Sequence, residues 1–406
     1  MQREDTVGVL KMKNKSIVLQ IFSGGFNENK ITFEAIEQKL RNILEKIDAD
    51  KIIIGWSTKK EIYIKIKELL KDYDTELYLW IPVFSEIGIL KDAVPSIDFK
   101  GEKVGSYTLQ EGENFQFYCP TDKKNIQRFI EIYEENFDDI GFDGVFLDKI
   151  RYGSFSNGID AVFSCFCTKC KELYKEKSLD LEALKKEINE LKGGKENYNK
   201  IPFNITGYNK GVYEFKNSIW SGFFRLKSEI IYDTLLTLKD YFSSKNMKIG
   251  IDTFSPFLAY FVGQDLYKLQ NIADFIKPMM YRITQAPAGL PFECDNLIKE
   301  SIRGDLNEAK KRYLKIINSE MYNDRFPIKF VKNELGFMTA SLKSDVYAGI
   351  EVNRKEPIAN VYPEYIKENL ENLNDTNIKG YVLSWDILSA PDENIHEITN
   401  YFCRRG

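Results

Sequence analysis

Residues 141–152 read GFDGVFLDKIRY, an apolar run that ends in an acid and is followed by basic side chains. A continuous apolar run is typical of a parallel strand that is buried on both faces. Side chains alternate along a strand, so Phe146 and Asp148 share one face. If Val145 and Leu147 face surrounding helices, Asp148 points the other way, where an unpaired buried charge would be costly. The stretch therefore predicts a buried strand that delivers Asp148 to a functional site.

Runs of this kind recur along the chain and alternate with amphipathic helical patterns. The strand that ends in this stretch covers 144–150 and is the fourth along the chain, and the others are expected at 16–22, 51–57, 76–84, 247–254, 274–281, 346–353 and 378–385. The helical patterns are clearest at 32–47, 60–71, 122–137, 216–243, 296–316 and 363–373. Eight strands, each followed by helical sequence, predict an α/β fold of the (β/α)8 or TIM barrel class.

Two local assignments depend on single features of the sequence. Thr121 is the expected N-cap of the helix that precedes the fourth strand. Residues 328–338, IKFVKNELGFM, could form a strand in place of loop and helix. In that case the seventh strand would be miscounted.

The chain is longer than a plain barrel requires. It has 406 residues, whereas a (β/α)8 barrel typically needs about 250. We expect the surplus in insertions after the third, fourth and sixth strands, the largest being a helical insertion at about 165–215. The expected organisation is an N-terminal extension at 1–15 and a single catalytic barrel over 16–403.

Composition and charge describe an ordinary folded protein and exclude several classes of function. The content of 43% hydrophobic and 29% charged residues is enough to bury a sizeable core. A net charge of −4 implies no general attraction to nucleic acid or to an anionic membrane. Without a signal peptide or an apolar run of about 18 residues, a cytoplasmic protein is expected. The single histidine, His396, argues against Ser-His-Asp triads, Cys-His dyads and polyhistidine metal catalysis.

Polar and aromatic side chains collect at the predicted strand ends, where a (β/α)8 barrel places its chemistry. Carboxylates on several strands can supply general acid, general base or nucleophile. Aromatic faces bury the C–H surface of a sugar, and the remaining side chains can hydrogen-bond its hydroxyls. The candidates at this rim are Trp56, Trp80, Glu86, Asp148, Arg151, Asp252, Lys277, Tyr281, Glu351, Asn353 and Trp385.

Among the acids, Asp148 and Glu351 form the leading catalytic pair, with Asp252 as a further candidate. Glu351 and Asp252 each lie two residues after an inward-facing glycine, so each shares the inward face of its strand. The alternative for a single acid at a strand end is a helix cap or a surface ion pair. Carboxylates with tryptophans and without histidine favour glycoside hydrolysis over other common barrel chemistry.

Three segments carry a resemblance to a known group. FDGVFLDKIRY (142–152) and ADFIKPMMYRITQAPAGLPFE (273–293) resemble the strand-four and strand-six segments of glycoside-hydrolase-like (β/α)8 barrels, and GYVLSWDI (380–387) fits their strand eight. The resemblance implies a carbohydrate-active barrel and no particular sugar. It marks Asp148, Arg151 and Tyr281 as site residues. Glu351 is similar in placement to the nucleophile of a large retaining-glycosidase clan, although Asp148 and its preceding leucine replace that clan's Asn-Glu.

Six cysteines are present, and three of them form a C-x-C-x2-C motif at Cys165, Cys167 and Cys170. Clustered cysteines in a long intracellular chain are more often metal ligands or free thiols than disulfides. With Cys119 as the fourth ligand, the pattern resembles the zinc site of one family of β-galactosidase barrels. The resemblance implies a structural zinc ion, since four cysteines leave no open position for substrate.

Other interpretations of the cysteines and of the barrel stay open. The clustered cysteines could be small buried hydrophobes, whereas a radical-SAM cluster requires a different spacing. Cys294 and Cys403 are expected to be unpaired. The sequence favours a glycosidase that acts on a carbohydrate or glycoconjugate. A barrel that binds carbohydrate without cleaving it, or a metal-free lyase acting on a sugar-containing substrate, remains possible.

Overall fold

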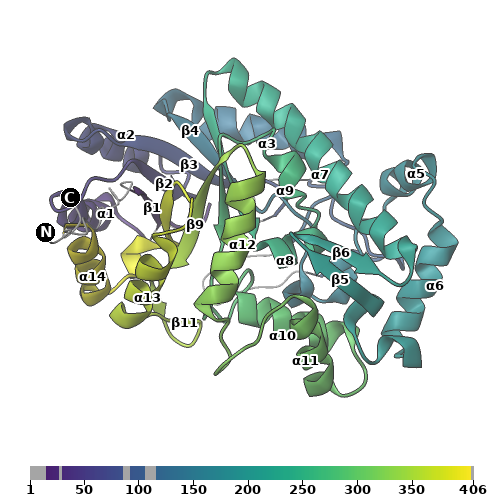
Figure 1. The fold of residues 1–406 in the computed structure, drawn as a ribbon. Helices are drawn as coiled ribbons and strands as arrows, with labels where there is room; N and C mark the ends of the chain where they lie inside the picture. The colour runs from purple at the N-terminus through teal and green to yellow at the C-terminus, as the bar shows by residue number, and fades with distance from the viewer. Residues whose placement is uncertain (1–14, 27–29, 86–91, 106–115, 404–406) are drawn as a thin grey trace, which may run out of the picture.

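The computed structural model describes residues 15–26, 30–85, 92–105 and 116–403. Its centre is a closed barrel of parallel strands in the order β1-β12-β9-β8-β7-β4-β3-β2 (Figure 1). The barrel strands are β1 (Ser16–Phe22), β2 (Lys51–Gly55), β3 (Glu76–Pro82), β4 (Gly144–Asp148), β7 (Lys248–Phe254), β8 (Phe275–Met279), β9 (Asp345–Glu351) and β12 (Gly380–Ser384). The predicted (β/α)8 fold and its eight strands are confirmed.

Helices surround this barrel, and further short strands lie outside it. The helices are α1 (Phe33–Leu44), α2 (Lys60–Leu69), α3 (Lys123–Asn136), α4 (Ile159–Val162), α5 (Thr168–Glu176), α6 (Leu181–Lys192), α7 (Ser218–Ser244), α8 (Pro256–Ala259), α9 (Leu266–Leu269), α10 (Leu290–Ser301), α11 (Leu306–Ile316), α12 (Ile328–Ser341), α13 (Pro363–Leu373) and α14 (Asp392–Cys403). The outer strands are β5 (Ile205–Asn209), β6 (Val212–Phe215), β10 (Arg354–Lys355) and β11 (Ala359–Asn360). No helix in these described ranges is long and apolar enough to cross a membrane.

Some local predictions differ from the structure. Residues 328–338 belong to helix α12, so the seventh strand was counted correctly. The helical pattern at 296–316 is divided between α10 and α11, because Asp305 caps the start of a new helix. Segment 165–215 holds α5 and α6 but ends in the antiparallel pair β5–β6, and Figure 1 shows α5 and α6 on the side away from the two termini. The expected extension at 1–15 lies almost entirely outside the described residues.

The N-cap of α3 is Asp122, so the prediction of Thr121 was wrong. The Asp122 carboxylate accepts a hydrogen bond from Lys124 N at 3.0 Å. The Thr121 hydroxyl instead lies 2.9 Å from Cys119 Sγ and 3.3 Å from Cys170 Sγ. These contacts, one with a near neighbour in sequence and one with the segment after β4, take the hydroxyl away from the helix.

Aromatic rings fill the barrel interior and explain why Asp148 faces inward. The Phe146 ring stacks on Phe275 with centroids 5.9 Å apart, and Tyr78 meets the same ring edge-on at 5.4 Å. Gly250 leaves room for this packing, since a Cβ there would lie 2.2 Å from the Phe275 ring. Because Phe146 points into the barrel, Asp148 two residues later lies on the same interior face.

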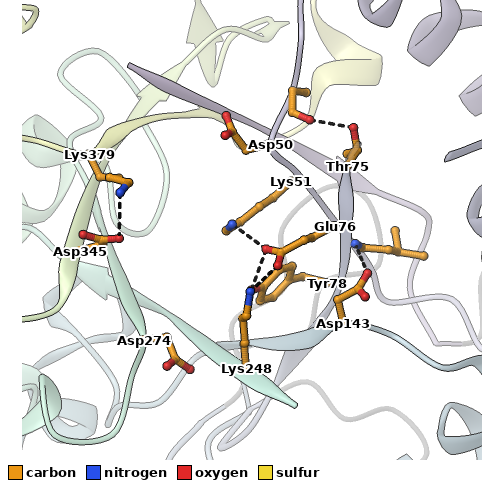
Figure 2. Close-up of polar contacts among 12 residues, drawn as sticks. Asp50, Lys51, Thr75, Glu76, Tyr78, Asp143, Lys248, Asp274, Asp345 and Lys379 are labelled. Atoms are coloured by element: carbon orange, nitrogen blue, oxygen red, sulfur yellow. Dashed lines mark hydrogen bonds and ion pairs between the residues drawn. The ribbon is translucent and has the colours of Figure 1, made fainter. Parts of the chain in front are cut away.

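The N-terminal end of the barrel is closed by hydrogen bonds and ion pairs (Figure 2). Three aspartates, each just before a strand, accept at 2.8 Å from the second amide of the preceding barrel strand: Asp50 from Ile17, Asp143 from Leu77 and Asp274 from Ile249. Glu76 lies between the ammonium groups of Lys51 and Lys248. These contacts satisfy backbone groups at the strand starts and stabilise this end of the barrel.

Candidate active site

A cavity of about 750 Å³ opens at the C-terminal ends of the barrel strands. This volume falls in the usual range for small-molecule sites, about 300–1,000 Å³. Seven of the predicted site residues line it: Trp56, Trp80, Asp148, Arg151, Asp252, Tyr281 and Trp385. Lys277, Glu351 and Asn353 are buried outside its lining, and Glu86 lies outside the described residues.

Asp148 ends β4 on the cavity floor, beside Asp252 of β7. Leu147 of β4 is paired with Ile251 of β7. Asp148 and Asp252 are the next residues on these two strands, so they lie side by side. One Asp148 oxygen accepts from Trp80 Nε1 at 3.0 Å, and the other accepts from the backbone N–H of the next residue at 2.5 Å. The carboxylate is therefore held in place by β3 and by its own backbone.

Asp252 is a buried acid with one carboxyl oxygen bound and the other without a partner among the described residues. It is 2% exposed, and its Oδ2 accepts from Lys277 Nζ at 2.8 Å. Its Oδ1 has no hydrogen-bond partner in the part of the chain that the structure describes. Burial raises the pKa of Asp252 to about 7, the Lys277 charge opposes this rise, and the Asp148 charge adds to it. Near neutral pH, Asp252 can therefore hold a proton and give it up.

Lys277 lies beneath the cavity floor, where it connects three side chains. Its fully buried ammonium donates to Asp252 at 2.8 Å, to the Tyr281 hydroxyl oxygen at 2.7 Å and to Gln20 Oε1 at 3.1 Å. An ammonium has three donors, and all three are used here. Gly349 of β9 leaves room for the lysine stem, since a Cβ there would lie 2.5 Å from it. Lys277 thus positions cavity residues and is shielded from a ligand.

Arg151 is also held by protein groups at the cavity wall. Its Nη1 donates to the Tyr152 carbonyl at 2.9 Å. The guanidinium lies 4.4 Å from the Phe254 ring centroid and 4.9 Å from that of Phe117. These aromatic contacts fix the planar group at the wall of the cavity.

Aromatic side chains form one wall of the cavity. Trp56 and Trp80 meet edge to face with centroids 5.4 Å apart, and Phe22 packs against both at 5.2 and 6.2 Å. Trp385 follows β12, which flanks β1 on the side away from β2. It is half-buried, and Lys355 Nζ lies 5.5 Å from its ring centroid. Such surfaces suit the apolar C–H faces of sugars.

The Glu351 carboxylate binds the segment after β8 and does not line the cavity. Its two oxygens accept from the backbone N–H groups of Arg282, Ile283 and Thr284 at 3.0–3.1 Å, from the Thr284 hydroxyl at 3.0 Å, and from the Tyr365 hydroxyl. Burial raises the pKa of this fully enclosed carboxyl, and the hydrogen bonds oppose the rise. Glu351 anchors the chain after β8, which forms part of the cavity wall.

The sequence prediction missed Gln20, which also lines the cavity floor. It is the one polar residue inside the apolar run of β1, since Ser16 stands at the start of the strand SIVLQIF. A fully buried glutamine within a strand requires hydrogen-bond partners. A polar residue inside an apolar strand was the sequence feature that could have identified Gln20. Asn353, which was predicted, is buried outside the cavity lining, and its amide atoms have no partner among the described residues.

The four clustered cysteines meet in the structure. Their sulfur atoms all lie within 4.8 Å of one another, and Cys119 Sγ is 3.5 Å from Cys167 Sγ and 3.6 Å from Cys170 Sγ. A disulfide would need a separation of about 2.05 Å. Four sulfurs around a tetrahedral zinc ion, each about 2.3 Å from it, would lie about 3.8 Å apart. The observed spacing therefore fits a four-coordinate metal.

The cluster joins two segments that leave adjacent barrel strands. Cys119 lies on the segment between β3 and α3, whereas the other three follow β4, with Cys167 as the N-cap of α5. Cys165 Sγ also accepts from the Ile97 N–H at 3.4 Å. Cys294 and Cys403 are free thiols, as expected, and take no part in the cluster.

Comparisons with known proteins provide support at the level of the fold. No protein-family profile matches the sequence, and no curated protein matches it. The structure is similar to the PgaB (BpsB) glycoside hydrolase domain from Bordetella bronchiseptica, with a TM-score of 0.57 and 11% identity over 96% of this chain and 98% of that one. It is also similar to α-L-fucosidase isoenzyme 2 from Paenibacillus thiaminolyticus, with a TM-score of 0.52 and 10% identity over 97% of this chain and 49% of that one. At these identities the likeness establishes the barrel fold alone.

Proposed function

We propose that the protein is a glycoside hydrolase in which Asp148 and Asp252 are the catalytic pair. The observation that carries this proposal is their position side by side on the floor of a tryptophan-walled cavity, with the pKa of Asp252 raised to about 7. The similar PgaB domain is named as a glycoside hydrolase, which supports the same class of reaction. The pair replaces the expected pair of Asp148 and Glu351, because the Glu351 oxygens are taken up by the segment after β8.

Asp252 is the proposed general acid. Asp252 lines the cavity, and its Oδ1 has no partner among the described residues, while Lys277 holds Oδ2. As the bond between the anomeric carbon and the glycosidic oxygen breaks, the Asp252 proton passes to the leaving oxygen. A raised pKa keeps that proton on the carboxyl until it is needed.

Asp148 is the proposed nucleophile. One of its oxygens forms a bond to the anomeric carbon as the leaving group departs. In the second step, ionised Asp252 takes a proton from water, whose oxygen displaces Asp148 and releases the sugar. Adjacent positions on neighbouring strands are about 4.8 Å apart, which favours the short carboxyl separation of retaining enzymes, about 5–5.5 Å.

The remaining cavity residues would bind the sugar. Trp56, Trp80 and Trp385 are the proposed stacking surfaces, and Arg151 and Tyr281 the proposed polar contacts. Lys277 is assigned a positioning role, since its three donors are engaged within the protein. Binding by Glu86 and Asn353 stays a prediction from sequence.

Zinc is the metal we propose for Cys119, Cys165, Cys167 and Cys170. The sulfur spacing and the all-thiolate donor set support it. Bound there, the ion would fasten the segment after β3 to the segment after β4 and take no part in bond cleavage. A closed four-sulfur site has no open coordination position.

Hydrolysis assays test the function as a whole. We expect the purified protein to cleave at least one aryl glycoside or oligosaccharide, and the Asp148→Asn and Asp252→Asn variants to lose that activity while staying folded. Saccharide binding with no turnover by the wild type would assign the barrel to carbohydrate binding instead.

A further inference from the structure

The orientation of the Gln20 side-chain amide is set by its partners. Its Oε1 accepts from Lys277 Nζ at 3.1 Å and from Ser384 Oγ at 3.0 Å. An ammonium can only donate, so the amide oxygen must face Lys277. The reverse placement of oxygen and nitrogen would set two donors against each other.

The amide nitrogen of Gln20 consequently points away from Lys277. Gln20 is 0% exposed and lines the cavity, and its Nε2 has no hydrogen-bond partner among the described residues. Buried polar groups nearly always have a partner in native proteins. The two N–H donors of this amide are therefore available to a molecule in the cavity.

Gln20 and Asp252 belong to one network, since both accept from the same Lys277 ammonium. In each of them the atom facing Lys277 is bonded, and the other terminal atom is unbonded in the described structure. The floor of the cavity thus presents a neutral donor close to the proposed general acid. A ligand that matches it must offer an acceptor near the group that Asp252 protonates.

We propose that Gln20 is a substrate-binding residue whose Nε2 donates to an uncharged oxygen of the sugar next to the bond that is cleaved. This assignment rests on the proposed function of the cavity. A hydroxyl or the carbonyl of an N-acyl group supplies such an oxygen. A carboxylate or phosphate at this point is disfavoured, because Asp148 lines the same floor and its carboxylate would repel it.

The substitution Gln20→Glu separates binding from a purely structural role. A glutamate keeps an oxygen for Lys277 and Ser384, and the ionic contact with Lys277 is at least as strong. It loses both N–H donors. A residue that only holds Lys277 would tolerate the change, whereas a residue that binds the sugar would not.

The experiment is equilibrium binding of chito-oligosaccharides and cello-oligosaccharides by calorimetry, in the Asp148→Asn background so that turnover does not interfere. We expect Gln20→Glu to raise Kd about tenfold, as for the loss of one hydrogen bond, without a lower Tm. A loss confined to the chito series identifies an acyl oxygen, and a loss in both series identifies a hydroxyl.

Ser384→Ala is the matched control, because it removes one donor from Gln20 Oε1 and leaves Nε2 in place. Its Kd is expected to stay within about threefold of the parent. An unchanged Kd in Gln20→Glu, or equal weakening in both variants, would overturn the proposal. A saccharide that binds through Gln20 but is never cleaved by the wild type would contradict only the hydrolase function, whereas no binding of either series would contradict both.

Discussion

Lys277 Nζ lies 2.8 Å from Asp252 Oδ2, and both side chains are almost completely buried. The lysine acts against the effect of burial, which by itself would raise the pKa of Asp252 further. The same ammonium orients Tyr281 and Gln20. One buried cation therefore sets both the protonation of the proposed acid and the arrangement of the cavity floor.

Replacing Lys277 by methionine should change the pH dependence of activity. A general acid works in its protonated form, so kcat/KM falls as pH rises through the pKa of Asp252, about 7. Loss of the nearby positive charge raises that pKa, so the alkaline limb should move up by about one pH unit or more. Lys332→Met, which removes an exposed partner of Asp375, is the control and should leave the limb in place. An unmoved limb in Lys277→Met would argue against the coupling.

Glu351 and Asp148 should respond differently to amide substitution. Glu351→Gln disturbs hydrogen bonds from several donors, so the free energy of unfolding in urea should fall by about 2 kcal/mol or more. Its kcat, measured on the folded protein, should stay within about tenfold of wild type. Asp148→Asn should instead lower kcat by at least about 100-fold with a small change in stability. The reverse pattern would restore Glu351 as the catalytic partner.

The cysteine cluster should contain zinc. Metal analysis of the purified protein is expected to give one zinc ion per chain, and Cys170→Ser should lower both the zinc content and Tm. Cys294→Ser is the control, since this thiol is equally buried but lies outside the cluster. A fully stable protein without metal would refute the site.

The reaction should retain the anomeric configuration. Asp148 and Asp252 occupy neighbouring positions on adjacent strands, which favours a separation too short for a water molecule between them. Proton NMR of the first product released from a suitable glycoside reports its anomer directly. Initial release of the opposite anomer would exclude Asp148 as a nucleophile.

Much of the barrel was predictable because its strands are buried on both faces. Continuous apolar runs mark such strands without help from long-range contacts. The alternation of Phe146 and Asp148 predicted the inward acid, and the C-x-C-x2-C spacing predicted the sulfur cluster. Each of these signals lies within a few residues of sequence.

The sequence did not indicate the hydrogen-bond partners of three side chains. Glu351 has the same inward parity as Asp252, but the amides after β8 bind its carboxylate. Thr121 has the sequence of an N-cap, but its hydroxyl contacts Cys119, two residues before it, and Cys170 on the segment after β4. Gln20 was overlooked because its partners, Lys277 and Ser384, come from other strands. Local patterns do not specify such partners.

The role of Asp252 as general acid is best decided through the leaving group of the substrate. A dinitrophenyl glycoside needs little protonation of its leaving oxygen, whereas an oligosaccharide needs a full proton. We expect Asp252→Asn to lower kcat/KM at least about 100-fold on an oligosaccharide that the wild type cleaves, and less than about tenfold on the matching dinitrophenyl glycoside. Equal losses on the two substrates, or undiminished cleavage of the oligosaccharide, would show that Asp252 is not the acid.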